Sequence, residues 1–494
     1  MKRDIDSKLV DWSRSSLRMP LLITGVRQCG KTHAMKELGE TEFGGDYAYF
    51  NFELEEDVRR IFENDLKPQR IVEELGVASG KAIVPGKTLL IFDEIQSCKR
   101  AITALKYFQE MMPEQHVVCA GSLLGVMLDH DFEQISFPVG KVERAQMYPM
   151  SFKEFFEAVN PNLFNLFEYR YNHGAPSPDT MKASLETTLR MYWIIGGMPK
   201  AVSTWIDTKD IAKVEAMQDK ILMDYENDFT KHASKDDVPH LHIVWNAIPG
   251  QLGKKNSKFV FSREKEAKSA WALERAVSWL SAAGLVHKLH MVDTPILPLS
   301  SRASSRDFVL YMADIGLLRK KANISPRSIL LNNEAFNPFK RMFNESFVMQ
   351  ELIALGKEPY NWAPKNNKEV DFIFQEVDDI VPVEAKAGEK TSAESFELFT
   401  KKTQPKYGFK VSMKNVGDHV VNGTRVYSVP LYLMWKLNDW IAIEKAKEPP
   451  FDMGEIYDDL LVVDEVLEEA NKSVENSELG CNIGPVKSDG PELD

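Results

Sequence analysis

The stretch MPLLITGVRQCGKTHAMKEL, residues 19–38, decides the fold of the N-terminal part of the chain. Its pattern predicts a short buried strand, a loop bounded by glycines, and a helix that begins near Lys31. The loop matches G-x-x-x-x-G-K-[ST], in which the two glycines let the backbone wrap closely around phosphate groups. We therefore expect a phosphate-binding P-loop that holds ATP with Gly25, Val26, Arg27, Gln28, Cys29, Gly30, Lys31 and Thr32.

Two side chains of this loop have separate predicted roles. The Lys31 ammonium is a point charge that would reach the β- and γ-phosphates, whereas the Thr32 hydroxyl would ligate Mg²⁺. The N-terminus of the following helix adds partial positive charge at the same place. ATP and Mg²⁺ are therefore the expected cofactors.

A second motif, GKTLLIFDEIQ at residues 86–96, predicts an apolar strand that ends in two carboxylates. An ATPase needs one carboxylate to hold Mg²⁺ and another to orient the attacking water. We expect Asp93 to be the metal-side acid and Glu94 to polarise the water, because successive strand residues point in opposite directions. The motif predicts hydrolysis of ATP as well as binding, with Glu94 and Lys31 as catalytic residues.

Three more segments predict the remaining strands of this domain. Residues 47–56, YAYFNFELEE, would form a strand that separates the P-loop strand from the strand of the second motif. Residues 116–124, HVVCAGSLL, would form a buried strand followed by Ser122, our candidate γ-phosphate sensor; the alternative is a simple turn at Gly121 and Ser122. A strand-like run within residues 135–156 closes the domain.

These motifs resemble those of a prokaryotic AAA-type (ASCE P-loop) ATPase family that carries a C-terminal domain of formerly unassigned function. The resemblance is carried by GVRQCGKT, LLIFDEIQ, GSLL, MYPMSFKEF and GGMP, and it runs nearly the full length of the chain. It implies an AAA-like ATPase core. Where relatives often have Gly-Arg, this chain has Gly140 and Lys141, with Arg144 three residues later. The arginine finger is therefore open between Lys141 and Arg144, and the alternative for Arg144 is an ordinary surface arginine.

The middle of the chain is predicted to be mostly helical. Residues 151–232 fit a helical lid in which one helix stops at Gly196 and Gly197, before Pro199. In residues 233–325, helices that end at Gly284 and run into an apolar strand resemble a winged helix, and the alternative is an oligomerisation or docking module. In a winged helix the following basic residues would offer phosphate contacts: Lys254, Lys255, Lys258, Arg263, Lys265, Lys268, Arg302 and Arg306.

The C-terminal region contains a second constellation of chemical groups. Asp371 is followed by Glu384 and Lys386, and Glu345 lies upstream on a predicted helix. Glu384 and Lys386 are two residues apart, so they share one face of a strand.

This pattern resembles the core of PD-(D/E)xK nucleases. The resemblance implies that Asp371 and Glu384 hold Mg²⁺, that Glu345 supports the metal or its water, and that Lys386 stabilises charge or activates the nucleophile. Two alternatives stay open: a chance match to a short pattern, and a nuclease-like fold that only binds nucleic acid.

Charge is distributed unevenly along the chain, whose net charge is −12. Residues 451–494 hold 13 acidic and 2 basic residues, so the rest of the chain is nearly neutral. Local basic clusters, including Lys401 to Lys414, permit a nucleic-acid face, and the alternative is a set of solvated surfaces. The acidic tail is expected to be partly disordered, and shielding of a basic site by it is a hypothesis.

Composition excludes several classes of protein. The apolar runs are too short to span a membrane, and the polar N-terminus has no signal-peptide pattern, so we expect a cytoplasmic protein with no membrane partner. The scattered Cys29, Cys98, Cys119 and Cys481 predict neither disulfides nor a zinc site.

The predicted fold is α/β, in five parts. These are an ATPase core at 1–150, a helical lid at 151–232, a winged-helix-like domain at 233–325, a restriction-endonuclease-like domain at 326–445, and an acidic tail at 446–494. The predicted function is ATP hydrolysis coupled to a Mg²⁺-dependent nuclease-like domain acting on nucleic acid, with DNA favoured over RNA and a homo-oligomer possible. The alternative is an ATP-switched binding or assembly factor whose nuclease-like domain is inactive.

Overall fold

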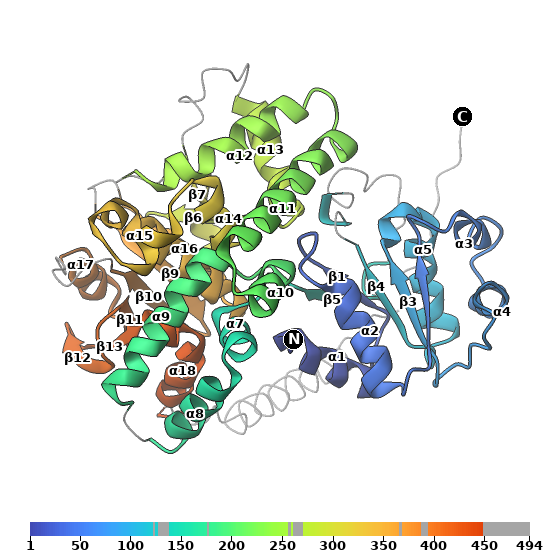
Figure 1. Cartoon of the computed structure of the whole chain (residues 1–494), viewed down its shortest axis with the longest axis horizontal. Coiled ribbons are helices and arrows are strands. Elements are labelled where there is room, and N and C mark those ends of the chain that lie inside the picture. The colour runs from blue at the N-terminus through green and yellow to red at the C-terminus, as the bar shows by residue number, and fades with distance from the viewer. Residues whose placement is uncertain are drawn as a thin grey trace, which may run out of the picture. The chain divides into compact units, whose positions relative to one another are not determined.

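The computed structural model describes residues 1–121, 124–126, 138–174, 177–254, 258–259, 270–364, 368–386 and 394–447. The chain divides into two compact units, Met1–Leu437 and Asn438–Asp494, and both sheets lie in the first. It contains a five-stranded sheet, a helical region and an eight-stranded sheet, in that order along the chain (Figure 1). None of the helices within the described residues is long and apolar enough to cross a membrane.

The first sheet is parallel throughout, with the strand order β2-β3-β4-β1-β5. Its strands are β1 (Leu21–Thr24), β2 (Tyr47–Asn51), β3 (Leu89–Asp93), β4 (Val117–Ala120) and β5 (Glu143–Gln146). Its helices are α1 (Asp4–Arg14), α2 (Lys31–Glu42), α3 (Glu56–Ile61), α4 (Pro68–Ser79) and α5 (Lys99–Met111). The predicted strand, loop and helix around Lys31 are confirmed, since α2 begins at that residue.

The predicted position of β2 is wrong. The strand that separates β1 from β3 is β4, whereas β2 is an edge strand that pairs only with β3. The cause lies in the side chains: all four residues of β4 are buried, while β2 alternates buried and half-buried residues. A strand that is apolar on both faces belongs inside a parallel sheet, and an alternating one can stand at its edge.

An aromatic cluster fixes the end of β3. The Phe92 ring lies 5.3 Å from Phe52, 6.0 Å from Phe62 and 6.4 Å from Phe108, centroid to centroid. All four rings are buried in one core cluster on this side of the sheet. Tight packing of this kind limits the movement of Asp93, the next residue along the strand.

The region after β5 is helical, as predicted. It consists of α7 (Phe152–Val159), α8 (Pro161–Asn172), α9 (Asp179–Ile195), α10 (Pro199–Thr208) and α11 (Ile211–His232). The predicted break after α9 is confirmed, because Gly196 has a φ of 79° and α10 begins at Pro199. A Cβ at Gly196 would lie 2.3 Å from Oδ1 of Asp314, so this break also allows a close approach of two segments.

The next segment contains two helices, a hairpin and two short helices. They are α12 (Val238–Leu252), α13 (Ala270–Ala282), β6 (Val286–Val292), β7 (Ala303–Met312), α14 (Ile315–Lys321) and α15 (Pro326–Leu330). The predicted stop near Gly284, followed by a strand, is confirmed.

The hairpin β6–β7 does not form a separate wing. β6 also pairs in parallel with β8 (Pro359–Trp362), so both hairpin strands belong to the second sheet. The boundary expected between residues 325 and 326 therefore divides elements of one sheet. The last five residues of β7 are all buried, and such a strand needs cover that an exposed wing would not provide.

The second sheet is mixed, with the order β12-β13-β11-β10-β9-β8-β6-β7. The remaining elements are α16 (Lys340–Ala354), β9 (Val370–Glu376), β10 (Asp379–Ala385), α17 (Glu394–Thr403), β11 (Tyr407–Ser412), β12 (Gly417–Val421), β13 (Thr424–Pro430) and α18 (Leu437–Lys445). The predicted strand pair is confirmed as the antiparallel hairpin β9–β10, in which Val383 lies opposite Phe372. α16, predicted as a helix, is buried along most of its length.

Candidate nucleotide site and a second carboxylate site

The P-loop is shaped by two glycines in conformations that other residues rarely adopt. Gly25 has a φ of 147° and Gly30 a φ of 106°. A Cβ at Gly25 would lie 2.1 Å from the carbonyl oxygen of Met147, on the segment after β5. The loop can therefore make its turn next to this segment only because residue 25 has no side chain.

Lys31 lies inside the loop. Its Nζ donates hydrogen bonds to the carbonyl oxygens of Gly25 at 2.8 Å and Val26 at 3.0 Å, and the residue is 7% exposed. Because α2 begins at the same residue, the free N–H groups of its first turn lie next to the ammonium. The arrangement fits a phosphate group, which a lysine and a helix N-terminus both stabilise.

Thr32 and Asp93 join the two predicted motifs. Thr32 Oγ1 donates a hydrogen bond of 2.7 Å to Asp93 Oδ2, and the Tyr49 hydroxyl donates one of 2.9 Å to the same oxygen. Burial raises the pKa of Tyr49 to about 12, so the tyrosine stays a neutral donor. A hydroxyl and a carboxylate oxygen at contact distance are the protein ligands expected beside nucleotide-bound Mg²⁺, so these residues fit that ion.

The direction of the Glu94 side chain is set by a left-handed backbone residue, and not by the strand alternation that we predicted. β3 ends at Asp93, and Glu94 has a left-handed backbone (φ 50°, ψ 45°) at the start of the short 3-10 helix η1 (Ile95–Ser97). Strand alternation therefore does not set its direction. Its carboxylate accepts a hydrogen bond of 2.5 Å from Gln96 Nε2, and this partner was missed although it stands in the same DEIQ motif.

Two P-loop side chains are bound by residues of α11. These contacts were not predicted from the sequence. Arg27 forms an ion pair with Asp228, and Gln28 Nε2 donates to Asp224 Oδ2 at 2.8 Å. The Tyr225 hydroxyl donates to the Arg27 carbonyl oxygen at 3.0 Å. Burial raises the pKa of Asp228, and the charge of Arg27 opposes that shift. No local signal could reveal these contacts, because about two hundred residues separate the partners.

The N-terminal segment also contacts the loop. Arg3 donates to the carbonyl oxygens of Cys29 and Tyr148, both at 2.7 Å, and its Nε lies 3.1 Å from a carboxylate oxygen of Glu154. The side chains of Arg3 and Glu154 are both 7% exposed. This buried pair therefore holds the segment before α1 against the P-loop, and no motif in the sequence indicated it.

Several predicted positions of the ATPase core are not brought to the P-loop by any described contact. Ser122 lies outside the described residues. Lys141 forms an ion pair of 3.3 Å with Glu110 of α5, and Arg144 is exposed on β5. The sensor and the arginine finger stay predictions.

A second site lies in the C-terminal sheet, where residues from three elements meet. Glu345 comes from α16, Asp371 from β9 and Glu384 from β10, with Lys386 just after β10. Lys386 forms an ion pair with Glu384, and the Ala385 N–H donates to Asp371 Oδ2 at 2.8 Å.

The carboxylates of this site raise one another's pKa. Burial is the main cause of the raised pKa of Asp371, and the charges of Glu384 and Glu345 raise it further. Burial raises the pKa of Glu345 to about 7, although the nearby Arg341 lowers it. Burial also raises the pKa of Glu384, against the charge of Lys386. Such shifts occur where like charges share a water-poor site, so the acids predicted from the sequence converge.

One carboxylate oxygen of Glu384 is free to contact a cation at the C-terminal site. Its Oε2 is buried and has no hydrogen-bond partner. Within the described ranges, however, no three His, Cys, Asp or Glu side chains form a group arranged to hold a metal ion. Mg²⁺ is commonly held by one or two carboxylates together with water and substrate phosphate, so the pair Asp371 and Glu384 fits that mode and not a closed protein cage.

Four further residues belong to this site and were missed. Lys410 of β11 lies opposite Glu384 in the register of β10 and β11, and the Tyr311 hydroxyl of β7 lies 3.5 Å from Glu345 Oε2. Arg341 pairs with Glu345 and lies 3.6 Å from Glu369. Arg341 could have been found from its spacing of four on one helix, whereas Lys410 and Tyr311 depend on strand order.

The basic residues predicted for a winged helix do not form one described patch. Lys258 pairs with Asp307, and Arg302 and Arg306 are exposed. Lys254 is exposed at the end of α12. Lys255, Arg263, Lys265 and Lys268 lie outside the described residues, as does the acidic tail from residue 448 onward.

Comparison with known families agrees with the geometry of the first sheet. Residues 17–156 match the model of an AAA domain. The chain contains an AAA-type P-loop ATPase domain. Residues 186–328 and 341–432 of this ATPase match two domains of unknown function, DUF8612 and DUF4143.

Solved structures of other ATPases show remote similarity. A Walker-type ATPase of Pyrococcus abyssi is 12% identical, with a TM-score of 0.41 and coverage of 65% of this chain and 95% of that one. AMPPCP-bound DnaA of Aquifex aeolicus is 12% identical, with a TM-score of 0.26 and coverage of 57% and 84%. The ADP form of the ORC2 protein of Aeropyrum pernix is 12% identical, with a TM-score of 0.27 and coverage of 66% and 92%. No curated protein matches the chain.

Proposed function

We propose that this ATPase hydrolyses ATP at its P-loop and uses the nucleotide cycle to control a C-terminal domain that cleaves nucleic acid, DNA in preference to RNA, with Mg²⁺. The observation that carries the proposal is the pair of sites in one compact unit. One has the Thr32–Asp93 hydrogen bond beside the P-loop lysine, and the other has converging acids beside Lys386.

At the P-loop, each residue has a role that its contacts support. Lys31, already inside the loop, exchanges its carbonyl partners for phosphate oxygens. Thr32 and Asp93 would hold Mg²⁺, which would neutralise phosphate charge, and Glu94 would orient water for attack on the γ-phosphate. Gln96, which donates to Glu94, positions that carboxylate.

At the C-terminal site, Asp371 and Glu384 present oxygens to Mg²⁺, which would polarise the scissile phosphate when bound. Lys386 and Lys410 supply positive charge on the same side as Glu384. Glu345 supports the site from α16, held by Arg341 and close to Tyr311.

A second candidate function has an observation in its favour. Lys386 is paired with Glu384 and Arg341 with Glu345, so cations of the chain itself already neutralise two of the acids. In that reading the C-terminal domain is an inactive docking module, and the ATPase is a switched binding or assembly factor.

The test is Mg²⁺-dependent cleavage of single-stranded, duplex and branched DNA and RNA, with and without ATP. Full-length wild type is compared with Lys386→Ala, Lys31→Ala and Lys87→Ala, the last being an exposed lysine before β3. Cleavage that is lost in Lys386→Ala and kept in Lys87→Ala supports the nuclease, and Lys31→Ala then reports whether ATP controls it. ATP hydrolysis without cleavage of any substrate leaves only the switched binding factor.

A further inference from the structure

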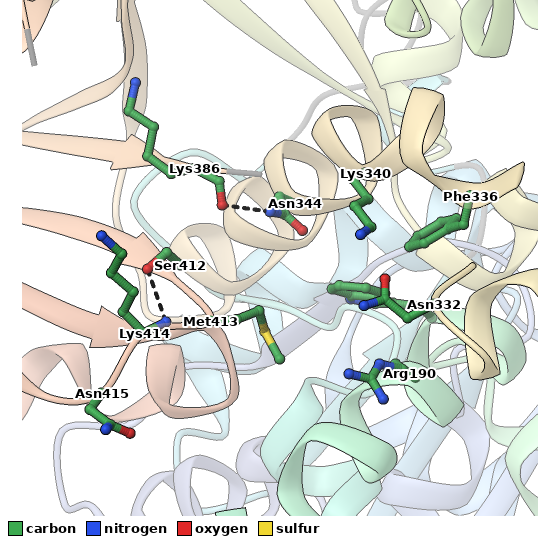
Figure 2. Close-up of a pocket in the computed structure, with 11 residues that line it drawn as sticks. Arg190, Asn332, Phe336, Lys340, Asn344, Lys386, Ser412, Met413, Lys414 and Asn415 are labelled. Carbon is green, nitrogen blue, oxygen red and sulfur yellow. Dashed lines mark hydrogen bonds between the residues drawn. The ribbon is translucent and has the colours of Figure 1, made fainter. Parts of the chain in front are cut away.

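A cavity of about 490 Å³ adjoins the C-terminal carboxylate site (Figure 2). It is lined by residues of α9, α16 and the segment after β11, together with Lys386 itself. Its volume falls in the range of about 300–1,000 Å³ that is usual for small-ligand sites. Lys386 is thus shared: it lines the cavity and also pairs with Glu384 of the carboxylate site.

The charge of the cavity has one sign. Arg190, Lys340, Lys386 and Lys414 line it, and among the described residues no acidic side chain does. Arg190 is partly neutralised by Glu186 at 3.1 Å, and Lys386 is paired with Glu384. Within the part of the chain that the structure describes, Lys340 and Lys414 have no ion-pair partner. Two lysines without an ion-pair partner among the lining residues favour an anion, and Figure 2 shows the Lys414 ammonium directed away from Lys340, toward the side of Lys386.

The other lining groups suit more than a bare phosphate. Trp193 contributes an apolar wall and packs against Phe336, 6.1 Å away between ring centroids. Asn344, 4% exposed, donates through Nδ2 to the carbonyl oxygen of Lys386 at 2.9 Å. Its amide lies between Lys386 and Lys340 in Figure 2, and its oxygen is the acceptor that remains for a ligand. Cations, an apolar wall and an amide acceptor together match a phosphate joined to a sugar and a base.

The position of Lys386 relates this cavity to the carboxylate site. Figure 2 shows its ammonium directed away from Lys340, while its main chain is tied to Asn344. A ligand in the cavity would therefore lie next to the carboxylate site, with only Lys386 between them.

We infer that the cavity binds one nucleotide unit of a nucleic-acid strand, whose adjoining phosphate lies at Asp371 and Glu384. The inference rests on the proposed action on nucleic acid, and it assigns Lys340, Lys414 and Asn344 to strand binding, outside the reacting groups.

The test measures binding apart from cleavage. Fluorescence anisotropy with a labelled ten-nucleotide single strand, in Ca²⁺ at low salt, compares full-length wild type with Lys340→Ala/Lys414→Ala. Loss of two phosphate contacts should weaken binding about tenfold, whereas Lys67→Ala/Lys87→Ala, which removes two exposed lysines of the ATPase domain, should change it less than about twofold. An unchanged rate of ATP hydrolysis verifies folding. The single variant Lys414→Glu, at an exposed position, should also weaken strand binding in the same anisotropy assay.

The outcomes separate this inference from the proposed function. Suppose that the double lysine variant binds the strand more weakly and that neither wild type nor any variant cleaves it. That result supports strand binding at the cavity and overturns the proposed nuclease activity. Normal binding and cleavage by that variant overturn the cavity assignment alone. Displacement of the strand by millimolar AMP supports a nucleotide unit. Binding of AMP or of a synthetic peptide of residues 455–469, without binding of any strand, overturns the inference in favour of a free nucleotide or an acidic segment.

Discussion

The two candidate sites are built in opposite ways. At the P-loop, the candidate nucleotide-binding residues come from one loop and the end of one strand, and their geometry is held by glycine backbone and short hydrogen bonds. At the C-terminal site the groups come from an α-helix and three or more strands, and buried acids raise one another's pKa. The first site is a preformed loop, whereas the second is a group of carboxylates whose like charges repel one another. The predictions below test that difference.

The largest effect is expected at Glu94, the carboxylate that we propose orients water. Glu94→Gln should lower kcat for ATP hydrolysis by about 10²–10⁴-fold with little change in KM, because the amide cannot accept a proton from water. Steady-state phosphate release measures it, with Glu63→Gln, an exposed glutamate of the same domain, as the control. A rate within threefold of wild type would show that Glu94 is not the base.

A smaller effect concerns the shape of the loop. Gly25→Ala should destabilise the protein by on the order of 2–3 kcal/mol and weaken ATP binding, because the new methyl group would lie 2.1 Å from the Met147 carbonyl oxygen at a φ of 147°. Gly44→Ala is the matched control, since Gly44 also has a positive φ but nothing lies within 4 Å of its Cβ. Equal loss in both variants, measured by chemical denaturation, would mean that backbone strain alone, and not the contact with Met147, is responsible.

At the C-terminal site the sign should reverse. Asp371→Asn removes a like charge at a partly buried position, and its side-chain oxygen can still accept from the Ala385 N–H, so stability at pH 8 should rise by about 1 kcal/mol. Asp93→Asn should give no such gain, because Asp93 accepts hydrogen bonds from Thr32 and Tyr49. Thermal denaturation compares them, with exposed Asp378→Asn as the control. A loss of stability in Asp371→Asn would contradict the picture of repelling acids.

The last effect is a dependence on pH, expected at a contact between α7 and α16. Burial raises the pKa of Glu351 to about 8, and its carboxyl accepts a hydrogen bond of 2.8 Å from the Phe152 N–H. The folded protein therefore keeps a proton that the unfolded chain loses above pH 4.5, and wild-type stability falls as pH rises toward 8.

Glu351→Gln removes this titration. Its stability relative to wild type should increase by about 1 kcal/mol per pH unit between pH 5 and pH 8. Denaturation midpoints across that range measure it, with Glu334→Gln, at an exposed position, as the control. A pH-independent difference between wild type and variant would show that Glu351 ionises in the folded protein much as it does in the unfolded chain.

The same contrast explains what could be predicted from the sequence. The P-loop, α2 and the end of β3 were predictable because their signals are contiguous: a glycine at each loop corner, then a helix, and an apolar run before Asp93. Strand alternation predicted the hairpin β9–β10 and placed Glu384 near Lys386, with which it forms an ion pair.

What could not be predicted depends on contacts between distant segments. The place of β2, the pairing of β6 with β8, and Lys410 opposite Glu384 all follow from strand order, which pairing energies over the whole sheet decide. The direction of Glu94 depends on one left-handed residue, and strand periodicity carries no information about it.

The helix α11 is bound at both of its halves. Near its C-terminal end Asp224, Tyr225 and Asp228 hold the P-loop, and nearer its start Glu215 and Gln218 bind the buried Arg319 of α14. Its 22 residues span about 33 Å at 1.5 Å per residue. The contacts to the P-loop and those to Arg319 lie about 10 residues apart on this helix, roughly 15 Å, so a rotation of about 10° around the P-loop contacts would move the contacts to Arg319 by about 3 Å. A change in the P-loop on phosphate binding would therefore displace α14. This helix directly follows β7, the strand that carries Tyr311.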